Sequence, residues 1–151
     1  MHEKEILLFT EAIKMAKDEF YLDAIKLLKQ LTDEFRDSEL VDDAIYNIGL
    51  CYFNMNQFEK AIELFQKVIS QYPDATISIL DGGNEFGKTA AKCHYALLNC
   101  FLALGKVNLA MDVLNSLNDF SDSYIINESG EKVTFKELAH KALNFFTKNI
   151  K

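Results

Sequence analysis

The chain has 151 residues, of which 49% are hydrophobic and 26% charged, and its formal net charge is −7. These values are typical of one soluble domain with a sizeable core. The negative charge disfavours a general nucleic-acid or anionic-membrane binder, because both need a positive surface. No apolar run approaches the roughly 18 residues that a helix needs to span a bilayer.

The N-terminus and the cysteines predict where the protein works. The first residues are charged and do not form a signal peptide. The three cysteines are an odd number, which does not suit a disulfide framework, and small buried side chains are the simpler interpretation. We therefore expect a cytoplasmic protein, and a periplasmic location stays open if a leader has been removed.

Seven stretches carry apolar residues at the three- and four-residue spacing of an amphipathic helix. In chain order, the predicted helices cover residues 3–19, 22–35, 40–55, 57–72, 88–104, 107–117 and 135–149. The last begins with Thr134 and Glu137 at capping-box spacing, which satisfies free backbone donors in the first turn. Short apolar runs at 124–126 and 132–133 predict a β-hairpin before this helix.

The segment 42–75 combines small, large and helix-breaking residues at fixed positions. It reads Ile45-x-x-Ile48-Gly49-x-x-Tyr52, then Phe58-x-x-Ala61-x-x-x-Phe65, then Pro73. Gly49 and Ala61 allow two helices to approach closely, and Pro73 falls where the second helix must stop. The pattern resembles the tetratricopeptide repeat family, whose signature is W-x-x-L-G-x-x-Y, then A-x-x-x-F, then P. The one departure is Ile45, which replaces a large aromatic residue.

The alanine-centred part of this pattern recurs on both sides, around Ala24 and Ala110. The resemblance therefore implies an all-α fold: a right-handed tetratricopeptide superhelix of three helical hairpins plus a C-terminal capping helix. The implied repeats cover about residues 5–38, 42–75 and 91–122, with an insertion at 76–90 and the cap at about 135–149, all in one domain spanning 1–151. The linker 38–44 also resembles bacterial envelope-associated members of the family.

The resemblance implies a non-enzymatic scaffold or adaptor that binds another protein, as a peptide or a helix. In the family, the first helix of each hairpin lines a concave groove. The implied groove residues are Phe9, Ile13, Tyr46, Asn47, Leu50, Phe53, Asn54, Lys92, Tyr95 and Asn99. Only Asn47 and Lys92 match the carboxylate clamp of co-chaperone members, and one cation cannot replace three. An amphipathic helix or an extended peptide is therefore the expected ligand.

A phosphate-loop motif is present in the insertion and offers a remote alternative. Residues 82–89 read GGNEFGKT, which satisfies G-x-x-x-x-G-K-[ST], and residues 76–80 can be a strand before it. A nucleotide-binding enzyme also needs a parallel sheet and a downstream magnesium-binding aspartate, and neither is predicted. Glu85 would also place a carboxylate beside the phosphates. A glycine-rich connecting loop is the favoured interpretation.

The remaining candidates for chemistry are weak. Glu137 and His140 have metal-ligand spacing, but two ligands without a second pair indicate a solvated helix face. No residue has a recognisable catalytic setting, so we expect no enzyme activity, no metal and no cofactor. The second functional alternative is a structural subunit that acts through self-association or complex assembly, with homo-oligomers forming through Phe145, Ile150 or the 74–87 loop.

Overall fold

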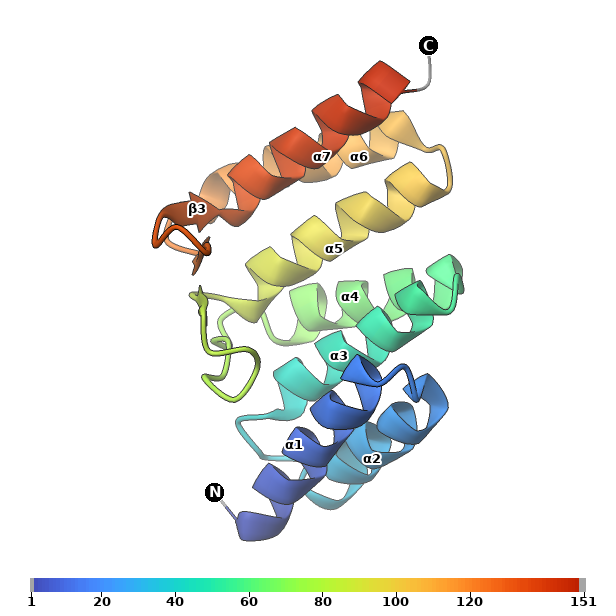
Figure 1. Ribbon diagram of the computed structural model, residues 1–151, viewed down its shortest axis with the longest axis vertical. Coiled ribbons are helices and arrows are strands. Elements are labelled where there is room, and N and C mark those ends of the chain that lie inside the picture. Colours follow the sequence, from blue (N-terminus) through green and yellow to red (C-terminus); the bar gives the residue numbers. More distant parts are fainter. Residues whose placement is uncertain (1, 150–151) are drawn as a thin grey trace.

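The computed structural model describes residues 2–149, and within this range it contains seven α-helices arranged as consecutive pairs (Figure 1). The first pairs are α1 with α2 and α3 with α4; α5 with α6 follows, and α7 packs on both. The helices are α1 (Glu3–Lys17), α2 (Tyr21–Glu34), α3 (Val41–Asn54), α4 (Phe58–Gln71), α5 (Thr89–Ala103), α6 (Val107–Ser116) and α7 (Phe135–Asn149). A single 3-10 turn, Leu117–Asp119, extends α6. The expected fold class, three helical hairpins and a C-terminal helix, is confirmed.

The three hairpin turns share one backbone geometry. In each turn, one residue after the first helix has a positive φ: 66° at Glu19, 61° at Asn56 and 73° at Gly105. The next backbone N–H donates back to a carbonyl in the last turn of the helix: Phe20 to Met15, Gln57 to Tyr52 and Lys106 to Phe101. This bond ends a helix and reverses the chain sharply. The three carbonyl acceptors stand at equivalent positions of the three hairpins.

Small residues bring the helices of the middle hairpin together, as the sequence predicts. A Cβ atom added to Gly49 would lie 2.7 Å from the Phe65 ring, and Ala61 is fully buried. The first four helices and one side of α5 share one hydrophobic cluster, and α5, α6 and α7 share another. Ile62 and Ile69 of α4 pack against both. The cysteines are free and buried, as expected for small apolar side chains.

The two segments that do not fit the repeat come together as one small antiparallel sheet. The predicted hairpin is confirmed as β2 (Tyr124–Ile126) and β3 (Lys132–Thr134). The insertion adds β1 (Glu85–Phe86), so the strand order is β1-β2-β3. The insertion and the sheet lie on the same side of the helices, beside the start of α5 and α7 (Figure 1).

The sheet corrects two details of the sequence interpretation. The fold is not purely helical, because it contains this three-stranded sheet. Its strand β1 was not predicted. The strand considered at 76–80 is not formed; Thr76 makes one isolated bridge to Lys88, and the chain then turns. Gly87 allows the insertion to meet the hairpin, because its φ is +105° and an added Cβ would lie 2.6 Å from the Ser123 Cα.

Candidate functional site

The first helices of the pairs and α7 line one face of the molecule. Figure 1 shows α1, α3, α5 and α7 side by side, with α2, α4 and α6 behind them. Contacts between α1 and α3, between α3 and α5, and between α5 and α7 join this face. The groove residues implied by the family resemblance all lie on α1, α3 or α5.

The insertion covers the N-terminal halves of α3 and α5 on this face, and a buried ion-pair cluster holds it there. Lys92 of α5 is only 4% exposed. Its Nζ donates to Asp81 Oδ2 at 2.9 Å and to Glu85 Oε1 at 2.7 Å, and both carboxylates belong to the insertion. The same ammonium lies 4.2 Å from the centre of the Tyr46 ring, which adds a cation–π contact.

Helix α3 holds the insertion through three further side chains. Asn47 Nδ2 donates to Asp81 Oδ2 at 3.1 Å and to the carbonyl of Asp43 at 2.8 Å. The backbone N–H of Ser78 donates to Asp43 Oδ1 at 2.9 Å. The hydroxyl of Thr89, at the start of α5, donates to Asp42 Oδ2. The insertion is therefore fixed to two helices by charged and polar groups that are buried or partly buried.

Burial changes the acidity of this cluster. Burial, together with the neighbouring Asp42, raises the pKa of Asp43 to about 8. Burial also raises the pKa of Asp42 and of Glu85. The raised pKa favours the protonated form of Asp43, whose Oδ2 atom has no hydrogen-bond partner within the described chain. Burial alone would lower the pKa of Lys92, but Asp81 and Glu85 outweigh it and keep the pKa raised.

The implied groove residues fall into three groups. Tyr46, Asn47 and Lys92 are buried beneath the insertion, and Phe9 is fully buried in the core. Tyr95 is half-buried, with its ring 6.4 Å from that of Phe135. The others lie beyond the insertion and are half-buried or exposed: Ile13, Leu50, Phe53, Asn54 and Asn99. We call this last group the open half of the concave face, after the groove that the family resemblance implies.

Sequence reasoning missed the acidic side of the cluster. Asp42 and Asp43 stand in the first turn of α3, where acidic residues are common in any helix. Asp81 and Glu85 stand in a glycine-rich loop that has no periodic pattern. The one available signal was Lys92, a lysine at a position that faces the groove. A lysine needs a carboxylate partner when a loop covers it.

The phosphate-loop motif has a different use in this fold. The backbone N–H of Lys88 donates to Ser123 Oγ, and the N–H of Thr89 donates to the carbonyl of Ala75. The Lys88 ammonium lies 3.6 Å from Asp74. Three donors of the motif, the backbone N–H groups of Lys88 and Thr89 and the Lys88 ammonium, thus contact other parts of this chain.

Comparison with known proteins supports the middle hairpin. Residues 43–75 form a tetratricopeptide repeat, since they match the model of that family. The match covers α3 from its first turn, all of α4 and the turn between them. No curated protein matches the chain. Within residues 2–149, no helix is long and apolar enough to cross a membrane, and no group of side chains there has the arrangement of a metal site.

Proposed function

We propose that this protein is a non-enzymatic protein–protein interaction module, acting as an adaptor or scaffold. The observation that carries this proposal is the tetratricopeptide repeat at 43–75, which suggests protein partners, set between two hairpins with the same turn geometry. Stacked helical hairpins present an extended face to a partner.

The open half of the concave face is the site we assign to the partner. Ile13, Leu50 and Phe53 provide apolar contact area, and Asn54 and Asn99 provide amides that can pair with an extended backbone. Phe53 is held in place by an edge-on contact with Phe58 at 5.3 Å. An amphipathic helix or an extended peptide fits this mixture. The insertion limits the length of ligand that the face can hold.

A capture experiment tests the site. The immobilised protein is compared with the variant Leu50→Ala/Asn54→Ala/Asn99→Ala and with Leu22→Ala, an exposed apolar control on α2. Proteins retained from a lysate are quantified by mass spectrometry, and circular dichroism checks the fold. A partner retained by the wild type and the control but lost by the triple variant supports the proposal. Equal retention by all three proteins contradicts the assigned site.

Self-association is the second candidate function. It is favoured by Phe145 of α7, whose side chain is 72% exposed. Ile150, which was considered together with it, lies outside the described residues. Light scattering over a wide concentration range tests this role, and a constant monomer mass would exclude it. If an oligomer forms, Phe145→Ser should shift it toward monomer.

A further inference from the structure

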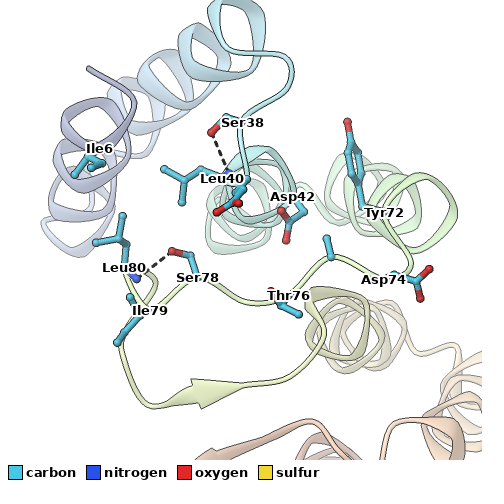
Figure 2. A pocket seen from close by; sticks show the side chains of 12 residues that line it. Ile6, Ser38, Leu40, Asp42, Tyr72, Asp74, Thr76, Ser78, Ile79 and Leu80 are labelled. Carbon is cyan, nitrogen blue, oxygen red and sulfur yellow. Dashed lines mark hydrogen bonds between the residues drawn. The ribbon is translucent and has the colours of Figure 1, made fainter. Parts of the chain in front are cut away.

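A cleft of about 680 Å³ lies at the edge of the molecule, away from the open half of the concave face. Its walls come from α1, from the α2–α3 connection with the start of α3, and from the first part of the insertion. Figure 2 shows Ile6, Leu40 and Leu80 pointing into the space between these three elements. Ile79 and Tyr72 complete its apolar lining. We call this feature the edge cleft.

The walls of the edge cleft are held in position before any ligand arrives. Leu40 N–H donates to Ser38 Oγ at 3.1 Å, and Leu80 N–H donates to Ser78 Oγ at 3.2 Å. Ser78 is in turn bound to Asp43 of α3. The buried Lys92 cluster fixes the rest of the insertion. A preformed cleft binds a ligand without the cost of ordering its own loops.

The charge of the edge cleft has one sign. Its lining includes three carboxylates, Glu39, Asp42 and Asp74, and no Lys, Arg or His side chain within the described part of the chain. Asp42 also lies in the first turn of α3, so it offsets the partial positive charge of that helix end. A neighbouring hollow shares Glu39 and adds Glu5, Asp37 and Glu34, which is paired with Lys4 at 2.9 Å, against Arg36 and His2. The negative potential therefore extends beyond the cleft.

Two of these carboxylates are free to meet a ligand. Within residues 2–149, Glu39 has no salt-bridge partner. Asp74 contacts Lys88 at 3.6 Å, but its side chain is 91% exposed, and such pairs contribute little. Beside them, the 77% exposed Ile79 offers apolar surface that the core does not use.

We infer that the edge cleft binds a cationic peptide segment of a partner protein. One aliphatic or aromatic side chain of the peptide lies against Ile6, Ile79 and Leu80, above the fully buried Leu40. Flanking Lys or Arg side chains of the peptide pair with Glu39 and Asp74. Nucleic acid, an anionic lipid surface and a second copy of this acidic chain would bring like charge to the cleft. This inference does not depend on the open half of the concave face.

Fluorescence anisotropy with short labelled peptides tests the inference. The probe has a central Leu flanked by Lys and Arg, with Gly and Ser at its ends. One matched peptide has Ser in place of the Leu, and another has Glu in place of each basic residue. We expect the probe to bind at least about tenfold more tightly than either, a difference well resolved by a titration. Affinity should fall between about 50 and 150 mM salt, because exposed ion pairs are screened.

Matched variants locate the binding. Glu39→Lys/Asp74→Lys should weaken binding at least about tenfold, whereas Glu59→Lys/Glu63→Lys, which changes two exposed acids of α4 and alters net charge equally, should not. Ile79→Ser should also weaken binding, and Leu22→Ser should not. An equal loss in both charge variants would show attraction by net charge alone and overturn the inference.

The remaining outcomes also decide the matter. Absence of probe binding, or equal binding of the Ser-containing or acidic peptide, overturns the inference. Loss of binding in Leu50→Ala/Asn54→Ala/Asn99→Ala, with no effect of the edge-cleft variants, would place the peptide in the open half of the concave face. That result would overturn the edge-cleft assignment while supporting the proposed function.

Discussion

Removing the Lys92 charge is the most direct test of how the insertion is held. In Lys92→Met the side chain keeps most of its length and apolar contact, but the ammonium is lost. Asp81 and Glu85 of the insertion then lie against the helices without the ammonium donor that is now 2.9 and 2.7 Å away. The insertion should either open to hydrate these carboxylates or remain closed at a large cost in free energy.

The burial of the three side chains sets the expected loss of unfolding free energy in Lys92→Met. The Lys92 side chain is 5% exposed, and those of Asp81 and Glu85 are 10% and 19% exposed. Removing one partner of a buried ion pair costs about 3–5 kcal/mol, because the other charge is left uncompensated. With a urea m-value of about 2 kcal/mol/M, a loss of about 4 kcal/mol lowers the unfolding midpoint by about 2 M. The control Lys88→Met breaks an exposed pair and should cost about 0–1 kcal/mol.

Urea unfolding followed by circular dichroism measures this difference, and a compensated variant separates charge from packing. The compensated variant is Lys92→Met/Asp81→Asn/Glu85→Gln, in which neither residue of the insertion keeps its charge. It should therefore recover much of the unfolding free energy that Lys92→Met loses. Burial raises the pKa of Glu85. In Lys92→Met, Glu85 should therefore hold a proton in the folded state that it releases in the unfolded state. Its stability deficit should be smaller near pH 5 than near pH 8.

The reasoning fails if Lys92→Met costs less than about 1 kcal/mol, the range of an exposed pair, while the insertion stays protected from proteolysis. It also fails if the compensated variant is no more stable than Lys92→Met, because the loss would then come from packing and not from charge.

Three further outcomes are expected. Asp43 has a folded pKa of about 8, above its ordinary value of 3.8, so the folded state binds an extra proton between these values. Wild-type stability should therefore fall as pH rises from about 4 to 8. Asp43→Asn should remove this contribution to the pH dependence of the urea midpoint, and an unchanged pH dependence would contradict the assignment. Ala61→Leu should destabilise the middle hairpin by about 1–3 kcal/mol in thermal unfolding, because Ala61 is fully buried and a larger side chain overpacks the site; unchanged stability would show that the close helix approach is not needed. Gly87→Ala should loosen the junction with Ser123, because the residue has a φ of +105°, and faster protease cleavage within residues 78–86 would reveal it; equal cleavage rates would count against that junction.

The helices could be predicted because their determinants are local. Apolar spacing located each one, and α7 begins and ends at the predicted residues, with Thr134 Oγ1 accepting the predicted capping bond from Glu137 N–H at 3.1 Å. The repeat signature at 42–75 added the close contact of Gly49 with Phe65, which the structure confirms. By contrast, β1 is two residues long and exists only through its pairing with β2. A strand that short has no alternation to detect.

The candidate site was only partly predictable. The family resemblance implied that Tyr46, Asn47 and Lys92 line the groove, and the structure has them on α3 and α5, buried beneath the insertion. It did not indicate that the chain's own insertion would cover them. The edge cleft was not predicted, because one of its walls is that same insertion.

The sequence by itself determined the helical hairpins, their turns and the tetratricopeptide character of the middle one. These depend on residues within a few helical turns of each other, so a periodic pattern records them. Only the tertiary structure decided which part of the concave face stays open and where the acidic edge cleft lies. Both depend on contacts such as those of Asn47 with Asp81 and Ser78 with Asp43, which join residues 34 and 35 positions apart. A sequence does not indicate whether a charged side chain will be hydrated or paired with another charge, because its partner depends on the tertiary structure.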